Sequence, residues 1–461
     1  MTGLPRPGEL VVVAGGGVSG IAVVRYLLEL GCRVLVTADR VAPTLPDDLT
    51  DIRRPLQVVA DLAAPPVETA LVITSPGFRP TNPLLVAARR AGVEVLGEVE
   101  LAWRLDRGSA QPRNWLVVTG TNGKTTTVGM LESILRAAGQ QVTACGNVGW
   151  PALEAVLAQP RQDTVAAELS SFQLHYAPSI RPRAGLVLNL VEDHLDWYDG
   201  SMAAYGADKA GALTGDIAVA VTDDPGAAEL LSRSPAGRRV PVTAGAPAAG
   251  ALGVSDGMLH DAAFGSGDLV PVSDIRPAGM HNVTNALSAA ALALSVGVSR
   301  AAVQEGLRAF TPGDHRNVEV ATVRGIRYVN DSKATNPHAA AASLAAYDRV
   351  VWIAGGQLKG ASIDELVRSV AGRLAGVVLL GIDADVIADA LSRHAPNVPR
   401  MRVPGTDDEV MTEVVDAATT MAARGDVVLL APAAASLDMF GSYAARGNAF
   451  AAAVAALGRR S

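Results

Sequence analysis

The sequence predicts an α/β protein of three domains, in which short parallel strands alternate with helices. Short apolar runs such as 10–14, 115–118 and 350–354 recur along the chain, and turn residues and helix-like segments follow them. Polar side chains come directly after most of these runs, which is where open parallel sheets bind their ligands. The 461 residues, 49% of them hydrophobic, are enough for two to four domains with large cores.

Composition excludes several classes of protein. The formal net charge of −7 argues against a nucleic-acid binder, which usually carries a basic patch. Two cysteines, Cys32 and Cys145, cannot form a disulfide framework, and this suits a reducing cytoplasm. Glycines at 15–17 and 20 interrupt the first apolar run, and no basic segment precedes it, so we expect neither a signal peptide nor a membrane span. Composition therefore predicts a cytoplasmic protein.

The first domain begins with a buried strand and a glycine-rich turn. The run 10–14 leads into Gly15–Gly20, whose glycine spacing fits the dinucleotide fingerprint, and a helix over 21–30 follows. Asp39 lies roughly 20 residues beyond the fingerprint. Such a turn admits a pyrophosphate at a helix N-terminus, and NAD, FAD and UDP-sugars all contain one. Further strands at 71–74 and 93–96 complete a Rossmann-like domain over residues 1–110.

The second domain, residues 111–312, opens with a phosphate-binding turn. The strand 115–118 leads into Gly120–Thr125, and a helix is predicted over 128–138. In such turns backbone N–H groups face phosphate, the lysine (Lys124) reaches the terminal phosphates, and a hydroxyl side chain holds Mg²⁺. Val118 replaces the first glycine of the standard pattern. We therefore predict a P-loop ATPase-like domain.

Other strands of this domain deliver polar residues at their ends. Runs at 142–144, 165–167 and 185–190 are followed by Gly146–Asn147, Glu168–Ser171 and Glu192–Asp196. Carboxylates and a histidine near a phosphate site are typical surroundings for Mg²⁺. Another strand is predicted at 217–221. The stretch 232–273, rich in Gly, Ala and Pro, gives no clear assignment.

The segment Gly279–Asn285 opens a helix that is predicted to run to about residue 296. Its His and Asn side chains are suited either to capping that helix or to presenting amides to a nucleobase. The sequence leaves both interpretations open.

The third domain, residues 313–461, repeats the strand-and-helix pattern. Strands are predicted at 326–330, 350–354, 377–380 and 427–430. Asp, Lys, Thr and Ser side chains follow these strands, so we predict a second Rossmann-like α/β domain with a site at the strand ends.

Lysine is rare in this chain. It occurs only at Lys124, Lys209, Lys333 and Lys359, so that 35 of the 39 basic residues are arginine. Lysine is a compact charge that can deprotonate and react, whereas arginine is a permanently charged planar fork. The four lysines are therefore predicted to mark positions where arginine cannot do the chemistry.

Six ordered motifs together resemble the Mur ligases, the ATP-dependent amide-forming enzymes of peptidoglycan precursor assembly. The motifs are Gly120–Thr126, Glu168–Gln173, Glu192–His194, Gly279–Asn285, His315–Arg316 and Asn330–Asn336. The segments that most resemble the branch of the family that adds D-glutamate are Ser75–Gly77, Asn330–Asn336, and Ser436–Phe440 with Arg446–Gly447.

The resemblance implies a three-domain ligase that acts in cell-wall synthesis. The first domain would bind UDP-N-acetylmuramoyl-L-alanine, the second would bind ATP with Mg²⁺, and the third would bring D-glutamate. ATP would phosphorylate the alanine carboxylate, and the amine of D-glutamate would then attack the acyl phosphate. We expect a monomer that acts on these small molecules and involves no nucleic acid and no membrane span.

The resemblance also assigns residues. The catalytic residues implied are Lys124, Asn147, Glu168, His194 and Lys209. The ATP contacts implied are Gly120, Thr121, Asn122, Gly123, Lys124, Thr125, Thr126, Asn282, Asn285, Arg316 and Asp331. The metal ligands implied are Thr125, Glu168, His194 and a carbamylated Lys209. The D-glutamate contacts implied are Lys333, Thr335, Lys359, Ser436 and Tyr443. The UDP-substrate contacts implied are Val18, Ser19, Asp39, Arg40, Ser75, Gly77, Asn147 and His194.

The sequence departs from the family pattern at a few positions. Ala38 stands where an acidic uracil contact is often found, and Tyr443 stands where phenylalanine often flanks the amino acid. Gln357 and Leu358 also differ from the acidic pattern that often precedes the lysine at 359.

Two alternatives remain open at this point. One is another Mur ligase, or a folylpolyglutamate-type ligase, that adds a different amino acid. The other, of a different class, is a Rossmann dehydrogenase fused to a nucleotide-binding regulatory module. The glycine fingerprint alone permits the dehydrogenase, but no hydride-transfer residues accompany it and the four lysines would stay unexplained.

Overall fold

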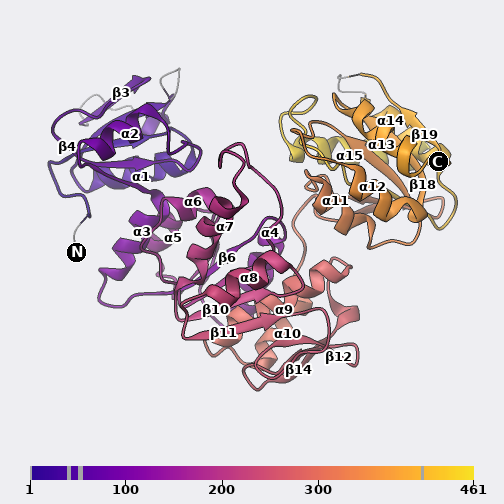
Figure 1. The fold of residues 1–461 in the computed structure, drawn as a ribbon, viewed down its shortest axis with the longest axis horizontal. Helices are drawn as coiled ribbons and strands as arrows, with labels where there is room; N and C mark the ends of the chain where they lie inside the picture. Colours follow the sequence, from indigo (N-terminus) through magenta and orange to yellow (C-terminus); the bar gives the residue numbers. More distant parts are fainter. Residues whose placement is uncertain (1–2, 39–42, 50–54, 406–409, 461) are drawn as a thin grey trace. The chain divides into compact units, whose positions relative to one another are not determined.

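The computed structural model describes residues 3–38, 43–49, 55–405 and 410–460. It is an α/β protein with three sheets, and Figure 1 shows the elements in chain order. Backbone contacts divide the chain into two compact units. One is Met1–Asp274 with Thr284–Phe310, and the other is Ile275–Val283 with Thr311–Ser461.

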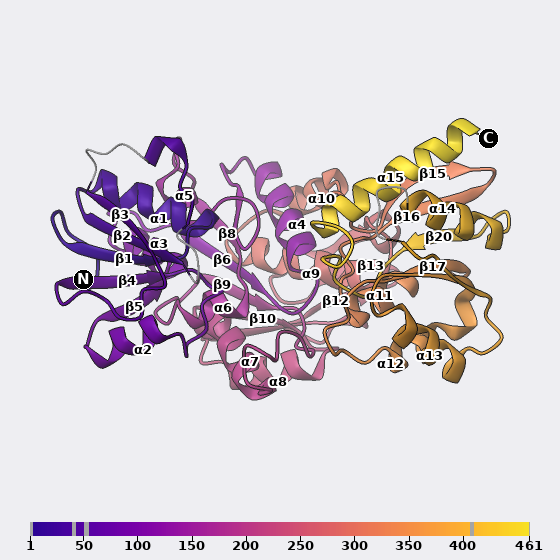
Figure 2. The same cartoon turned by 90° about the horizontal axis from the view of Figure 1, so that it is seen from above.

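The first sheet is wholly parallel, with strand order β3-β2-β1-β4-β5. Its apolar side chains pack on both faces, as expected for a parallel sheet covered by helices. Figure 2 shows α1 and α2 on opposite sides of the strands. The strands are β1 (Leu10–Ala14), β2 (Arg33–Ala38), β3 (Leu56–Ala60), β4 (Thr69–Thr74) and β5 (Glu94–Gly97). The helices are α1 (Val18–Glu29), α2 (Pro83–Arg90) and α3 (Glu98–Arg107).

The second sheet has nine strands in the order β14-β13-β12-β11-β10-β9-β6-β8-β7. It is parallel from β7 to β12 and ends in the antiparallel strands β13 and β14. The strands are β6 (Asn114–Thr119), β7 (Ala144–Gly146), β8 (Thr164–Glu168), β9 (Ala184–Val187), β10 (Ile217–Val221), β11 (Arg238–Val242), β12 (Leu252–Ser255), β13 (Met258–Asp261) and β14 (Gly267–Pro271). The helices are α4 (Lys124–Ala137), α5 (Ala152–Leu157), α6 (Ser171–His175), α7 (Met202–Ala210), α8 (Pro225–Arg233), α9 (Met280–Ser295) and α10 (Arg300–Ala309).

The third sheet has the order β15-β16-β20-β17-β18-β19 and is parallel except for the edge strand β15. One face packs against α11–α13 and the other against α14 and α15, as Figure 2 shows. The strands are β15 (Val318–Val323), β16 (Ile326–Asn330), β17 (Val350–Gly355), β18 (Leu374–Leu380), β19 (Arg400–Arg402) and β20 (Val427–Leu430). The helices are α11 (Pro337–Leu344), α12 (Asp364–Val370), α13 (Ala384–His394), α14 (Val410–Met421) and α15 (Tyr443–Arg460).

The first two sheets belong to one unit and share an apolar cluster. Helix α3 connects them through two buried carboxylates. Glu98 accepts a hydrogen bond from the backbone N–H of Leu153 at 2.5 Å, and Glu100 accepts one from the N–H of Ser179 at 3.1 Å. These bonds fix the last helix of the first domain to the body of the second.

Several boundaries differ from the sequence expectations. Helix α4 begins at Lys124 and not near residue 128, because Gly123 adopts a left-handed conformation that ends the turn there. Strand β9 ends at Val187, three residues before its predicted end, and β7 is Ala144–Gly146 rather than 142–144. The unassigned stretch 232–273 contains the four strands β11–β14.

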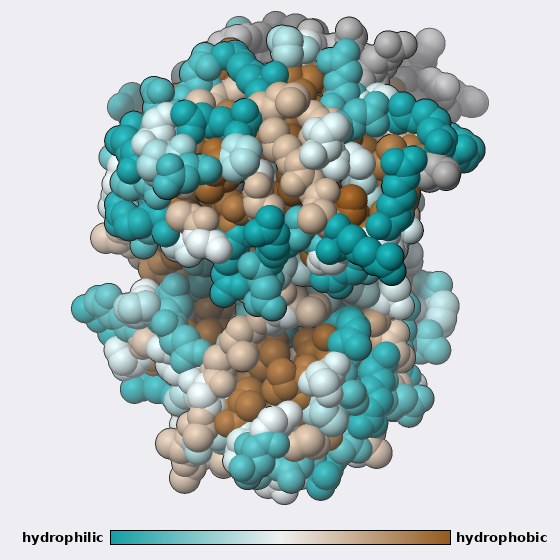
Figure 3. Space-filling model, turned by 90° about the vertical axis from the view of Figure 1, so that its right-hand side faces the viewer, coloured by the Kyte–Doolittle hydropathy of each residue, from teal (hydrophilic) through white to brown (hydrophobic). Residues whose placement is uncertain are grey.

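Within the described ranges, no helix is long and apolar enough to cross a bilayer. The face drawn in Figure 3 mixes hydrophilic and hydrophobic side chains.

Candidate active site

The turn after β6 can be built only with glycine at two positions. Gly120 has φ 147° and Gly123 has φ 86°, both in the region that side chains disfavour. A Cβ at Gly123 would also lie 2.6 Å from Asn285 Oδ1. Gly123 is the N-cap of α4 and supplies no side-chain cap. The first-turn N–H groups of α4 have no partner within the helix, and the positive end of its dipole suits an anion.

Two of the four lysines meet at this turn. Lys124 Nζ donates to the carbonyl oxygens of Gly120 and Thr121, each at 2.9 Å. Lys209 Nζ, from α7, donates to the same Gly120 oxygen at 2.8 Å. The structure therefore places the Nζ atoms of two lysines on one carbonyl oxygen.

Lys209 is buried to an unusual degree for a lysine. It is 2% exposed, and its Nζ lies 4.6 Å from the ring centroid of Tyr205. Burial, and then the charge of Lys124, lower the pKa of Lys209 well below its ordinary value, and the carboxylates of Asp193, Glu168 and Asp208 oppose this. A lowered pKa increases the share of neutral amine, which is the form that can react at nitrogen.

A buried carboxylate lies near the two lysines. Glu168, at the end of β8, is 1% exposed, and its Oε1 accepts a hydrogen bond from Asn147 Nδ2 at 2.8 Å. Its other oxygen, Oε2, has no hydrogen-bond partner among the described residues. A buried, unpartnered carboxylate oxygen is costly unless a cation or donor meets it. This site therefore fits a divalent cation in the place that the sequence predicted.

His194 also lies on the carboxyl side of the second sheet. Its backbone has φ 53°, its ring packs edge-on against Phe172 at 5.2 Å, and its side chain is 51% exposed. Its Nε2 lies 3.6 Å from Asp193 Oδ2. In the described part of the chain no three His, Cys, Asp or Glu side chains form a ready-made metal cage. Mg²⁺ often takes one or two carboxylates and completes its shell with water and phosphate, so such a cage is not required.

The two asparagines predicted to read adenine lie on α9. Asn285 is 4% exposed and contacts the phosphate turn at Gly123. Asn282 belongs to the other unit, where its Nδ2 lies 2.9 Å from His281 Nε2. Desolvation of the half-buried His281 lowers its pKa to about 4, so the ring is neutral and Nε2 accepts from the amide.

One residue that the sequence did not single out holds the phosphate turn. Asn189 Oδ1 accepts hydrogen bonds from the N–H groups of Thr121 at 3.0 Å and Asn122 at 2.8 Å. Its Nδ2 donates to the carbonyl oxygen of Asn122 at 3.1 Å. The only signal in the sequence was an asparagine at the end of an apolar run.

The glycine turn of the first domain also assembles as predicted. A Cβ at Gly15 would lie 2.1 Å from Ser75 Oγ, and a Cβ at Gly20 would lie 2.0 Å from the carbonyl oxygen of Gly15. Ser75 Oγ is buried, with no hydrogen-bond partner in the described ranges. Val18 and Ser19 form the first turn of α1, where Val18 is 71% exposed, and Gly77 follows β4. The predicted contacts Asp39 and Arg40 lie outside the described residues.

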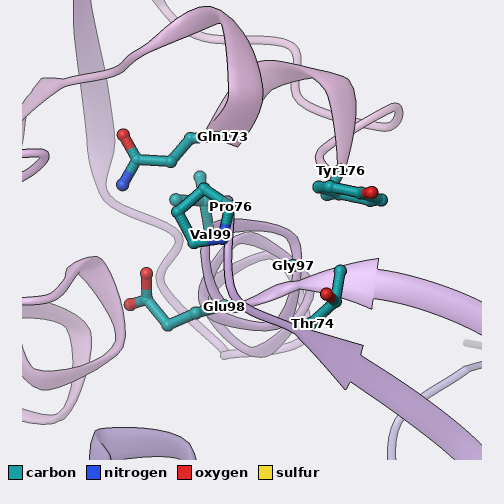
Figure 4. A pocket seen from close by; sticks show the side chains of 7 residues that line it. All are labelled: Thr74, Pro76, Gly97, Glu98, Val99, Gln173 and Tyr176. Atoms are coloured by element: carbon teal, nitrogen blue, oxygen red, sulfur yellow. The ribbon is translucent and has the colours of Figure 1, made fainter. Parts of the chain in front are cut away.

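A small pocket adjoins this region within the first unit. Figure 4 shows Glu98 and Gln173 on one side and Thr74 and Tyr176 on the other. Burial raises the pKa of Glu98 to about 7, against the effect of the hydrogen bond from Leu153. The residues that line this pocket are Thr74, Pro76, Gly97, Glu98, Val99, Gln173 and Tyr176.

The third sheet gathers the remaining predicted residues in the second unit. Lys333 Nζ lies 4.1 Å from the ring centroid of Tyr443, and the N–H of Thr335 donates to the carbonyl of Lys333 at 2.8 Å. Burial raises the pKa of Asp331 to about 6, although the charge of Arg316 lowers it. The structure therefore places Lys333 against Tyr443, and it joins Thr335 to the backbone of Lys333.

Two loops at the end of this sheet are joined by backbone hydrogen bonds. Gln357 and Ala435 exchange N–H···O bonds at 2.8 and 2.9 Å, which ties the loop of Lys359 to the loop of Ser436. Lys359 is exposed and has φ 53°, whereas Ser436 is 3% exposed.

A buried arginine supports this site. Arg446 is 1% exposed and donates to Ser332 Oγ at 3.0 Å, to the Ser332 carbonyl at 2.9 Å and to the Ala434 carbonyl at 3.1 Å. Burial lowers its pKa to about 10. Arg446 therefore links the loops that follow β16 and β20.

Comparison with known proteins identifies the family. Three family descriptions match: the Mur ligase MurD-like N-terminal domain over residues 9–97, the Mur ligase middle domain over 118–293, and the Mur ligase, glutamate ligase domain over 315–434. A UDP-N-acetylmuramoylalanine–D-glutamate ligase of Mycolicibacterium smegmatis is 52% identical, with 98% of this chain and 97% of the relative covered. One of Thermobifida fusca is 51% identical, with 98% and 99% covered.

Solved structures share the fold at lower identity. A UDP-N-acetylmuramate–alanine ligase of Thermotoga maritima is 19% identical with a TM-score of 0.59, covering 97% of this chain and 99% of that one. A pseudomurein peptide ligase of Methanothermus fervidus is 18% identical with a TM-score of 0.60, covering 98% and 100%. The family descriptions and the near-full-length relatives confirm the resemblance: this chain belongs to the Mur ligase family.

Proposed function

We propose that this chain is an ATP-dependent ligase that joins D-glutamate to UDP-N-acetylmuramoyl-L-alanine in peptidoglycan precursor synthesis. Relatives about 50% identical over nearly the whole chain carry that activity in their names. The structural observation that carries the proposal is the site after β6, where Lys124 and Lys209 share one carbonyl beside the buried Glu168.

The reaction has two steps. The alanine carboxylate attacks the γ-phosphorus of ATP, and the bond from that phosphorus to the β–γ bridging oxygen breaks. ADP is the leaving group, and the product of this step is an acyl phosphate. The D-glutamate amine then attacks the acyl carbon and loses a proton, and the bond to the phosphate oxygen breaks to release phosphate. Most of the catalysis is positioning and charge neutralisation around the transferred group.

The P-loop residues neutralise the phosphates. The first-turn N–H groups of α4 and the ammonium of Lys124 bind the phosphate oxygens, with Gly120, Thr121, Asn122, Gly123, Thr125 and Thr126 shaping the turn. Asn147 is held against Glu168, and we assign its remaining amide hydrogen to the reacting carboxylate. Asn282 and Asn285 contact adenine, and Arg316 and Asp331 complete the ATP contacts.

We assign Mg²⁺ to Thr125, Glu168, His194 and a carbamylated Lys209. The unpartnered Oε2 of Glu168 supports this assignment. The lowered pKa of Lys209 supports carbamylation, in which the neutral amine adds to CO₂ and loses a proton to give a carbamate. Mg²⁺, when bound, would offset the negative charge of the phosphates.

The substrates divide between the domains. We assign the UDP-linked substrate to residues 1–110, through Val18, Ser19, Asp39, Arg40, Ser75 and Gly77. Residues 111–312 bind ATP. Residues 313–461 bind D-glutamate, where Lys333, Thr335, Lys359, Ser436 and Tyr443 surround it and the two lysines meet its carboxylates. We expect the enzyme to work as a cytoplasmic monomer.

Phosphate release with single amino acids tests the proposal. Purified protein is given ATP, Mg²⁺, UDP-N-acetylmuramoyl-L-alanine and one amino acid at a time. D-Glutamate should support turnover, and L-glutamate, L-alanine and diaminopimelate should not. Turnover with diaminopimelate or L-alanine in place of D-glutamate would refute the assignment and point to another Mur ligase.

A further inference from the structure

The peptide planes of the phosphate turn have a common orientation. In a trans peptide the N–H and the C=O point in opposite directions. The N–H of Thr121 shares a plane with the Gly120 carbonyl, and the N–H of Asn122 shares one with the Thr121 carbonyl. The N–H of Asn122 donates to Asn189 Oδ1 at 2.8 Å, and the N–H of Thr121 is shared between Asn189 Oδ1 at 3.0 Å and the backbone carbonyl of Asn189 at 3.1 Å. Both carbonyls therefore point away from Asn189 and toward the lysines.

Those two carbonyls are the ones that hold the ammonium groups. Lys124 Nζ donates to both oxygens at 2.9 Å, and Lys209 Nζ donates to the Gly120 oxygen at 2.8 Å. Asn189 thus orients the carbonyls that accept from the two lysines: its carboxamide meets both peptide planes, and its backbone carbonyl also meets the first. It also occupies two N–H groups of the loop, which shifts the anion-binding donors to the start of α4.

The segment that carries Asn189 is itself held in place. Thr121 Oγ1 donates to the Val191 carbonyl at 3.0 Å and accepts from the Val191 N–H at 3.2 Å. Since the hydroxyl hydrogen of Thr121 goes to Val191, the hydroxyl of Tyr205, 3.0 Å away, donates to Thr121. The N–H of Leu190 donates to Asp224 Oδ1, which also caps α8. Asn189 consequently has little freedom to move away from the turn.

We propose that Asn189 is a positioning residue for ATP, which sets the orientation of the phosphate turn and the place of the Lys124 ammonium. The proposal rests on the ATP-dependent function proposed above. Asn189 contacts no reacting atom, so its loss should weaken ATP binding specifically and leave the other two substrates unaffected.

Three variants test this role: Asn189→Ala, Asn189→Asp and a control, Asn114→Ala. Asn114 is an exposed asparagine at the start of β6, at the opposite end of the same strand. Removing several hydrogen bonds should raise both the KM for ATP and the Kd for ADP of Asn189→Ala about 10-fold or more. Asn189→Asp keeps the acceptor for the two N–H groups and loses the donor to Asn122, so a rise of about 3-fold is expected.

The KM values for D-glutamate and for the UDP-linked substrate should stay unchanged in both variants. Equal KM for ATP in Asn189→Ala and Asn114→Ala would overturn the proposal, as would parallel losses for all three substrates. If Asn189→Ala does not fold, an unchanged KM for ATP in Asn189→Asp overturns it. Wild-type protein that binds ADP but never turns over with D-glutamate would refute the proposed function and leave the role of Asn189 standing.

Discussion

The two pairs of lysines differ in how the protein surrounds them. Lys124 and Lys209 lie at one turn of the second sheet, and Lys209 is 2% exposed with a pKa well below its ordinary value. Lys333 rests on the Tyr443 ring and Lys359 is exposed, both in loops that follow strands of the third sheet. Burial makes an amine reactive, whereas exposure keeps it a permanent cation for an anionic ligand. The same residue type is therefore suited to two different tasks.

Replacing Lys124 by arginine should give the largest effect. The ammonium of Lys124 meets two carbonyls at the head of α4, and a planar guanidinium cannot make the same contacts in that space. Lys124→Arg should lower kcat by about 10³-fold despite keeping the charge. Phosphate release under saturating substrates measures this. Activity within a few-fold of wild type would show that charge alone is enough.

Lys209→Ala should lower kcat by about 10²-fold, and added carboxylate should restore part of it. A carbamate supplies a carboxylate on the lysine nitrogen, so formate or acetate in the cavity left by the side chain could take its place. The matched control is Lys209→Arg, which leaves no cavity and should show no recovery. Equal absence of recovery in both variants would count against carbamylation.

Lys359→Met should raise the KM for D-glutamate about 10-fold with little change in kcat, since a charged hydrogen bond to a carboxylate is lost. Lys359 is exposed, so this substitution should not alter stability. Steady-state kinetics with varied D-glutamate and varied ATP separate the two substrates. A rise in the KM for ATP instead would place Lys359 at the nucleotide.

Lys209→Met should stabilise the folded protein, by about 1 kcal/mol at neutral pH, although it should lower activity as Lys209→Ala does. The pKa of Lys209 is 10.5 in the unfolded chain and lower in the folded protein. At pH values between these two, the folded state binds fewer protons than the unfolded state. Lys209 therefore makes the free energy of unfolding rise with pH in this range. The variant should lose that rise. Urea unfolding at pH 7 and pH 9 measures this change in the free energy of unfolding. Lys359→Met is the control, and it should leave the free energy of unfolding at both pH values as in the wild type.

Much of the fold could be predicted because its strands are short, apolar and bounded by turns. Strands β1, β10, β16 and β20 begin and end at the expected residues. The strands β11–β14 could not be predicted, because they lie in a stretch rich in Gly, Ala and Pro and are only four or five residues long. Propensity gives little information for such segments, and their pairing decides their structure.

Site residues could be predicted where a sequence motif marks them. They could not be predicted where only the path of the folded chain brings a residue to the site. Lys124 and Glu168 lie close together because they are at the ends of the neighbouring strands β6 and β8, and α7 brings Lys209 to the same turn. Asn189 was hidden inside an expected strand, since β9 ends at Val187 and only the three-dimensional path brings its carboxamide to the turn. The start of α4 was also missed, because a run of threonines gives a weak helix signal while the left-handed Gly123 decides the boundary.

The carboxylates of α3 have a consequence for exchanging domains among relatives. Residues 108–112, between α3 and β6, are the obvious place to join halves of two proteins. Glu98 and Glu100, however, already bond to the second domain through Leu153 and Ser179. A chimera joined there would pair these side chains with foreign backbone, so that Glu98 and Glu100 could lose the bonds from Leu153 and Ser179. An exchange of domains should therefore keep α3 together with the second-domain segments that contain Leu153 and Ser179. The better place to join two relatives lies before α3.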